Sequence, residues 1–266
     1  VLALYLGSTF ARYHQFLHSP QMGVRGGRST LEVLLQIPFP FESLDAVSRA
    51  KWSALHRELV EFSDERWRIL EEHPDLDLAR WRGTHTLQGL EHRVDQLVAD
   101  ALGLHPHERW LVEDLVHVRS ALVDSKVGDA AARCPERFEI ASYAQALRDT
   151  LDLWLDRGER FRHRVTVVHG APAGVVQIEF ENSPQPHPCV VEAADSEAGR
   201  ALRAVREHLD AQPPQWLYFD RNLVMHLDGR VFLFKPMQRV SWTRSQALAD
   251  ADRIITDLVA AGATAS

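Results

Sequence analysis

The spacing of apolar residues changes once along this chain of 266 residues, and that change limits the folds available to it. Across residues 43–138 apolar side chains recur close to every 3.6 positions, which is the period of a helix with one buried face. Later the apolar runs are short and separated by turn residues, first at 164–168 and 175–180, then at 223–227 and 230–234. The sequence therefore predicts an α+β protein in which a helical region precedes a small sheet.

Residues 139–266 are predicted to form a compact α+β module with two β-hairpins. A turn from Gly170 to Gly174 separates the first pair of strands, and Asp228-Gly229 separates the second. Asp-Gly between two apolar runs is among the strongest short-range signals for a hairpin. A final helix is predicted to open at Thr243 or Ser245.

Residues 43–138 are predicted to form a helical spacer. The apolar stripe from Leu44 to Leu59 indicates one helix, and Ser63-Asp-Glu is predicted to begin another. Gly103 is expected to end a later helix, and Pro106 is expected to start the next, because glycine favours the position after a helix and proline its first turn.

Residues 1–42 are predicted to contain a strand, a helix and a glycine-rich loop. Gly23, Gly26 and Gly27 allow positive φ, and Arg25 and Arg28 carry forked donors that suit phosphate or guanine edges. The loop is therefore a candidate for binding a polyanion. The alternative is a surface loop whose arginines only solvate a turn.

A resemblance favours the first of these interpretations. Leu2-Ala-Leu-Tyr-Leu-Gly-Ser-Thr-Phe-Ala-Arg-Tyr-His-Gln-Phe16, the loop, and Leu34-Leu-Gln-Ile-Pro-Phe-Pro40 resemble the end of a DNA target-recognition domain. The pattern is similar to that of type I restriction specificity subunits and of the C-terminal parts of type IIG-like adenine-N6 DNA methyltransferases. The run from Leu90 to Leu104, with Glu108 beyond it, is similar to the segment that closes those methyltransferases, although Ala101 stands where an aromatic residue is usual. Residues 231–248 resemble a tail found on some of the same enzymes.

The resemblance implies a function in which the chain positions DNA and does not catalyse. It implies that the chain, which opens on Val1, is a piece of a longer enzyme of a restriction-modification or phage-defence system, with residues 1–42 as the end of a recognition domain. Double-stranded DNA and a methyltransferase domain or subunit are the expected partners. S-adenosylmethionine is expected in the parent enzyme, and no cofactor is expected in this chain.

The charge of the chain limits how strongly it is expected to hold DNA. The formal net charge is −7, whereas a free-standing duplex binder usually has a basic face. Residues 1–30 nevertheless carry Arg12, Arg25 and Arg28 with no acid, and residues 216–245 also have a net charge of +3. Two basic segments on an acidic body predict local contact with a polyanion and a low affinity.

Since no apolar run reaches the roughly 18–20 residues of a membrane span and there are only two cysteines, a cytoplasmic protein is predicted.

The second basic segment is the other candidate DNA-binding site. Lys235, Gln238, Arg239, Trp242 and Arg244 place cations, an amide and an aromatic ring within ten residues, as grooves for nucleic acid do. The alternative is a connection between a strand and a helix, with Trp242 packed against the sheet and the arginines paired with surface acids.

No catalytic or metal-binding motif stands in the sequence. A methyltransferase requires a glycine-rich cofactor loop and an Asn/Asp-Pro-Pro-aromatic motif, and neither is present. The His residues lack the spacing of a metal site. Two other functions therefore stay open: an interaction module that docks a methyltransferase or helicase partner without touching DNA, and a nuclease hidden in the module from 139 onward, with Glu179 and Asp220 as its candidate acids.

Overall fold

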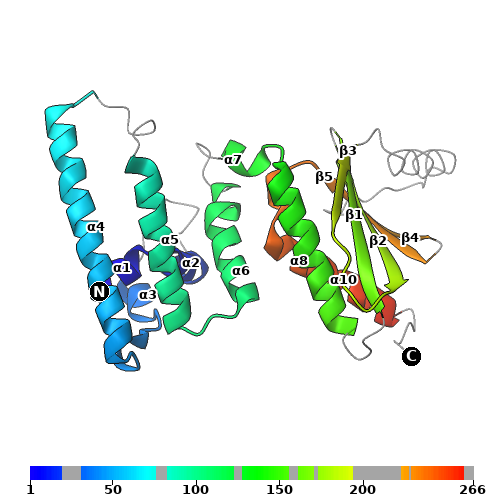
Figure 1. The fold of residues 1–266 in the computed structure, drawn as a ribbon, viewed down its shortest axis with the longest axis horizontal. Helices are drawn as coiled ribbons and strands as arrows, with labels where there is room; N and C mark the ends of the chain where they lie inside the picture. The colour runs from blue at the N-terminus through cyan, green and yellow to red at the C-terminus, as the bar shows by residue number, and fades with distance from the viewer. Residues whose placement is uncertain are drawn as a thin grey trace. The chain divides into compact units, whose positions relative to one another are not determined.

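The computed structural model of this chain describes residues 1–19, 31–75, 83–122, 128–155, 161–170, 173–193, 223–227 and 229–260 (Figure 1). It divides the chain into two compact units, Val1–Val123 and Asp124–Ser266. The mixture of helices with one five-stranded sheet makes the protein an α+β fold.

The described part of the first unit is helical. Its elements are α1 (Leu2–Gly7), α2 (Thr9–His18), α3 (Leu31–Leu35), η1 (Pro40–Glu42), α4 (Ala46–Glu72), α5 (Gly83–Ala101), α6 (Pro106–His117) and η2 (Arg119–Leu122). As predicted, Pro106 is the first residue of α6, and Gly103 follows α5 with a φ of 65°, a conformation that glycine adopts without strain.

One hydrophobic core joins the beginning of the chain to the long helices of the first unit. Tyr5 of α1 and Ile37 are buried with Trp52 of α4 and with Val94 and Val98 of α5. The Tyr5 hydroxyl also donates a hydrogen bond to the Pro38 carbonyl. Residues on both sides of position 42 therefore contribute to the same core, and the unit continues to Val123.

Two predictions for the first unit are wrong. The strand expected before α2 is the helix α1, because Leu and Ala favour helix and because the buried residues Leu4 and Tyr5 are adjacent, whereas a half-buried strand buries alternate positions. The helix expected to begin at Ser63 does not begin there, since α4 runs through that residue for 27 residues without a break. It contains neither Gly nor Pro, so nothing in the sequence forces an end.

The second unit combines a sheet with two long helices. Its described elements are α7 (Gly128–Ala132), α8 (Arg137–Leu155), β1 (Phe161–His169), β2 (Ala173–Asn182), β3 (Val190–Ala193), β4 (Leu223–Leu227), β5 (Arg230–Pro236), η3 (Arg239–Trp242) and α10 (Arg244–Ala260). The final helix thus begins at Arg244, with Thr243 as the preceding residue, and the Thr243 hydroxyl accepts a hydrogen bond from the Gln246 backbone N–H at 3.2 Å.

The strand order in the sheet is β3-β1-β2-β5-β4, and every described pair is antiparallel except β1 with β3. The segments predicted as strand partners pair with each other, β1 with β2 and β4 with β5, while residues 171–172 and 228 between them lie outside the described residues. The register places Val167, Val176 and Leu233 side by side on one face, and all three are buried. Helix α8 packs against β1 and against α10, which gives this unit its core (Figure 1).

Candidate functional site

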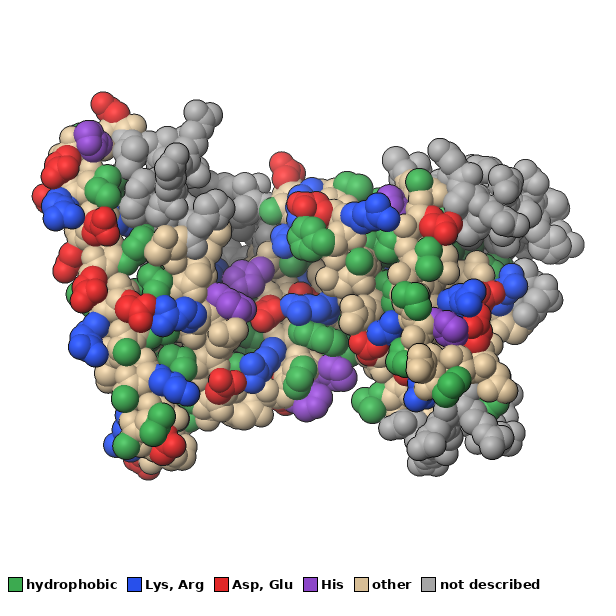
Figure 2. Space-filling view, in the orientation of Figure 1, with side chains coloured by type: hydrophobic (Ala, Val, Ile, Leu, Met, Phe, Trp, Pro, Cys, Tyr) green, Lys and Arg blue, Asp and Glu red, His purple; other side chains and the backbone are tan. Residues whose placement is uncertain are grey.

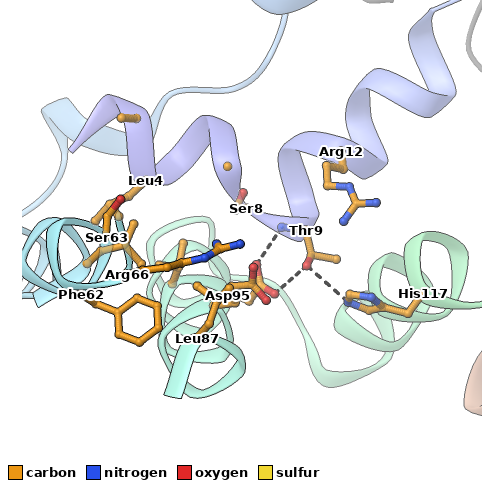
Figure 3. Close-up of a pocket in the computed structure, with 15 residues that line it drawn as sticks. Leu4, Ser8, Thr9, Arg12, Phe62, Ser63, Arg66, Leu87, Asp95 and His117 are labelled. Atoms are coloured by element: carbon orange, nitrogen blue, oxygen red, sulfur yellow. Dashed lines mark hydrogen bonds between the residues drawn. The ribbon is translucent and has the colours of Figure 1, made fainter. Parts of the chain in front are cut away.

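A cavity of about 330 Å³ lies in the first unit, between α1, α2, α4, α5 and the end of α6 (Figure 3). Its lining has polar and apolar parts. The polar residues are Ser8, Thr9, Arg12, Ser63, Arg66, Glu91, Asp95 and His117, and the apolar ones include Leu4, Leu59, Phe62, Leu87 and Val94. The volume falls at the lower end of the roughly 300–1,000 Å³ that is usual for small-molecule sites.

Asp95 joins α5 to the beginning of α2 inside this cavity. One carboxylate oxygen accepts the Thr9 backbone N–H at 2.7 Å, and the other accepts the Thr9 hydroxyl at 2.6 Å. The Thr9 hydroxyl has one proton, which it donates to Asp95, so its 3.4 Å contact with His117 Nε2 requires that nitrogen to be the donor. The three side chains therefore form a fixed polar arrangement in which Thr9 connects the carboxylate to the imidazole.

The break between α1 and α2 explains why Thr9 faces Asp95. Ser8 has an extended conformation between the two helices, and its hydroxyl accepts the Ala11 backbone N–H at 3.2 Å, which makes Ser8 the N-cap of α2. Thr9 is then the first residue of α2, where its own N–H has no partner within the helix. A carboxylate at that position is stabilised by the hydrogen bond and by the positive end of the helix.

Two arginines bring positive charge to the cavity. Arg12 lies one turn after Thr9 on α2 and is exposed, and Arg66 reaches toward Asp95 from α4 with its side chain partly buried (Figure 3). Within the part of the chain that the structure describes, neither guanidinium pairs with an acid. Because neither guanidinium has a hydrogen-bond partner among the described residues, both are available for a ligand.

Of the residues predicted from the sequence to bind DNA, Arg12 is the one that the structure places in this cavity. Arg25 and Arg28 lie outside the described residues. The acids and bases on the drawn face of the molecule are interspersed and do not form a single basic surface (Figure 2).

The predicted cluster around Lys235 is not a surface groove. The Lys235 side chain is 0% exposed and forms an ion pair with Asp250 of α10, and Trp242 is buried with its indole N–H bonded to the Pro236 carbonyl at 2.9 Å. The prediction that Lys235 and Trp242 touch DNA is at odds with this packing. The alternative interpretation, in which Trp242 packs against the sheet, agrees with the packing. The reason is that Lys235 lies two residues after the buried Leu233 on β5 and therefore points to the same buried side of the sheet.

The other members of that cluster lie nearer the surface. Gln238 is exposed and Arg244 is partly exposed. The Arg239 guanidinium contacts Glu139 of α8 at 2.7 Å, and Arg133 contacts the same carboxylate at 2.8 Å. Burial of the Glu139 carboxylate acts to raise its pKa, but the hydrogen bond from the Glu136 backbone N–H and the two arginines outweigh burial, so the pKa is lowered.

Burial also changes the proton affinities of the Lys235 group. The Lys235 ammonium lies 4.0 Å from the centre of the Tyr143 ring, and the Tyr143 hydroxyl donates to Asp250 at 2.6 Å. Loss of water lowers the pKa of Lys235 to about 8, against the opposing effect of Asp250. Burial, reinforced by the negative charge of Asp250, raises the pKa of Tyr143 well above its ordinary value. The three side chains of this arrangement are buried in the core of the second unit and present no group to a ligand.

The described residues give no support to a nuclease centre. Among them there is no group of three or more His, Cys, Asp or Glu side chains that could hold a metal ion. Glu179 pairs with Arg230 across β2 and β5 at 2.8 Å, and Asp220 lies outside the described residues. The two cysteines, Cys134 and Cys189, are free.

Sequence reasoning did not identify Thr9, Arg66, Asp95 or His117 as site residues. Thr9 and Asp95 are 86 positions apart, and Thr9 and His117 are 108 positions apart, so no local motif connects them. The one available signal was the pair Ser8-Thr9 before an apolar helix, which is typical of a helix start and marks where a donor N–H needs a partner.

Comparison of the chain with protein-family models, with curated proteins and with solved structures found no match. Of the helices that the structure describes, none combines the length and the apolar character needed to cross a membrane.

Proposed function

We propose that this chain is the DNA-positioning, target-recognition portion of an adenine-N6 DNA methyltransferase from a restriction-modification or phage-defence system. The observation that carries the DNA-binding part is the pair Arg12 and Arg66, two arginines on one cavity without an acidic partner among the described residues. The enzyme class comes from the resemblance of residues 1–40 and 90–104 to such proteins. Methyl transfer, with its S-adenosylmethionine, belongs in this proposal to a separate domain or subunit in the cytoplasm.

In the proposed mechanism the first unit holds the sugar-phosphate backbone and does no chemistry on it. Arginine matches phosphate with two parallel hydrogen bonds, so two such residues on neighbouring helices fix the position and direction of a strand. Backbone contacts carry no sequence information, and base readout is assigned to the segment with Arg25 and Arg28. The acidic remainder of the chain then faces solvent or the catalytic partner.

The test is binding of a fluorescent duplex DNA by the full chain at low salt, measured by anisotropy. Arg12→Ala/Arg66→Ala is expected to weaken binding about tenfold or more, because each phosphate contact contributes to affinity. The matched control is Arg57→Ala/Arg68→Ala, which removes two exposed arginines of α4. Arg57 is nine residues from Arg66, about two and a half helical turns, and therefore lies on the opposite side of α4.

Equal weakening by both double variants would show that only net charge matters and would contradict a site at the cavity. Absence of DNA binding by the parent chain would favour the second candidate, an interaction module. The observation in its favour is the exposure of Leu31 and Leu35 on α3, at 72% and 76%, since exposed apolar side chains close together suit a protein partner.

A further inference from the structure

We propose that the cavity of the first unit binds a single nucleotide, with the ring system against Phe62 and Leu87 and the phosphate between Arg66 and Arg12. The inference deepens the proposed function and rests on that function for the source of the nucleotide. The source is a nucleotide of a DNA strand whose base is unstacked from its neighbours. The binding chemistry does not depend on that source, so a free nucleoside monophosphate should bind as well.

The shape and lining of the cavity limit the ligand. In the close-up, Phe62 and Leu87 lie at one end, Arg12 and His117 lie at the other, and the Arg66 side chain extends between them (Figure 3). A ligand that fills this space needs an apolar or aromatic part at one end and an anionic part at the other. A volume of about 330 Å³ suits one ring system with one phosphate and is small for a dinucleotide.

The charges of the cavity favour an anion although it contains two acids. Asp95 has both oxygens hydrogen-bonded by Thr9 and faces the positive end of α2, which stabilises its negative charge and offsets part of its field. Glu91 is exposed and keeps its contact with water. The Arg12 and Arg66 guanidinium groups have no such partner in the described structure, and a phosphate is the anion that their forked donors match best.

The polar groups near the arginines can complete the recognition of a phosphate or sugar. The Ser63 hydroxyl comes from the exposed face of α4 and can donate to a ligand oxygen, while the His117 ring lines the cavity with its Nε2 hydrogen already directed to Thr9. A ring placed on the Phe62 side loses water-exposed surface and contacts an aromatic side chain, which is how proteins hold unstacked bases. The cavity thus offers one set of contacts for the base and another for its phosphate.

The test compares three probes on the full chain by isothermal titration calorimetry: dAMP, deoxyadenosine and inorganic phosphate. We expect dAMP to bind at least tenfold more tightly than either fragment, because it alone uses both ends of the cavity. Arg66→Gln is expected to reduce dAMP affinity at least tenfold, and Arg57→Gln, on the opposite side of α4, is expected to leave it unchanged. Equal affinity for dAMP and phosphate, or equal effects of the two variants, would overturn the inference.

The aromatic end needs a variant that does not hollow the core, because Phe62 also packs against buried residues. Ser63→Phe adds a ring to the cavity from an exposed position and is expected to abolish dAMP binding while unfolding stays at the same urea concentration. Undiminished dAMP binding by this variant would place the nucleotide elsewhere and refute the site.

The outcomes separate this inference from the proposed function. If dAMP does not bind but duplex DNA still binds through Arg12 and Arg66, the backbone contact stands and the nucleotide site is wrong. If dAMP binds to the cavity but neither duplex nor single-stranded DNA binds, the site takes a free nucleotide and the DNA-positioning function is wrong.

Discussion

At the scale of single residues, the buried Lys235 makes the stability of the second unit depend on pH. Its pKa is about 8 in the folded protein and ordinarily 10.5, so between these values the unfolded chain binds more protons than the folded one. The free energy of unfolding of this unit is therefore expected to rise with pH from about 8 toward 10, by up to about 1.4 kcal/mol per pH unit. Above pH 10 the raised pKa of Tyr143 reverses the trend, since the unfolded tyrosine then loses its proton first.

The measurement is the urea concentration at which α8 unfolds in the full chain, determined at each pH. Pulsed hydrogen exchange of peptides from α8 reports the unfolding, and the labelling pulse is always given at the same pH. Lys235→Met removes the titrating group and should flatten the rise between pH 8 and 10. A rise of the same size in that variant would assign the effect to another group.

Gly174 is a second residue at which a small change has a calculable effect. A Cβ built on Gly174 would lie 2.7 Å from the Trp242 ring and 3.0 Å from Met237 Sδ, and Trp242 is buried and cannot move without opening the core. Gly174→Ala is therefore expected to cost about 1–3 kcal/mol, the range for an overpacked core. Gly89→Ala, where a Cβ meets nothing within 4 Å inside α5, should instead stabilise the first unit by about 0.5–1 kcal/mol.

Thermal unfolding of both variants provides the test, and a loss of stability in Gly89→Ala as large as that in Gly174→Ala would mean that the contact with Trp242 is not the cause.

Single residues also show how much of the structure the sequence reveals at this scale. Gly103 and Pro106 were predictable because their roles are local, whereas the burial of Lys235 depends on Asp250, which lies 15 positions later on another element.

At the scale of elements, the continuity of α4 has a direct test at Asp64. If a helix began at Ser63, residue 64 would be its first position, where proline is favoured. In the structure residue 64 lies within a continuous helix, where proline removes a hydrogen bond and collides with the carbonyl four residues earlier. Asp64→Pro is expected to destabilise the first unit by about 3 kcal/mol or more, and Asp64→Ala is expected to have little effect. Circular dichroism during urea unfolding measures both, and a proline variant as stable as the alanine one would restore the two-helix interpretation.

The elements show why periodicity predicted some segments and not others. The long stripe of α5 and the short runs of β1, β2, β4 and β5 have periods that only one type of structure satisfies. The segment Leu2–Gly7 is too short for its period to be read, and its type is decided by Tyr5, which packs against α4 and α5 residues that are distant in sequence. Ser63-Asp-Glu has the composition of a helix start, but α4 passes through it because no residue there interrupts the backbone hydrogen bonds.

At the scale of the whole molecule, two compact units account for the mixed pattern of the sequence, and the change of apolar period was a sufficient signal for the α+β class. The candidate site was much harder to predict than the fold. Its residues come from α1, α2, α4, α5 and α6, and each is an ordinary helical residue until the first unit brings them together. Arg12 was found through the local excess of positive charge, which is a property of the sequence, while Asp95 and Arg66 acquire their roles only from packing.

The net charge of −7 gives the last prediction, because a long-range repulsion and a local phosphate contact respond differently to salt. For duplex DNA the logarithm of the binding constant falls with the logarithm of salt concentration by about 0.9 for each phosphate neutralised. Arg12→Ala/Arg66→Ala should therefore make that slope shallower by about 2. Arg57→Ala/Arg68→Ala changes the net charge equally. We expect this control to leave the slope nearly unchanged and to shift the affinity slightly at all salt concentrations. Anisotropy titrations from about 20 to 200 mM salt measure both, and parallel lines for the parent and the Arg12/Arg66 variant would mean that these arginines neutralise no phosphate.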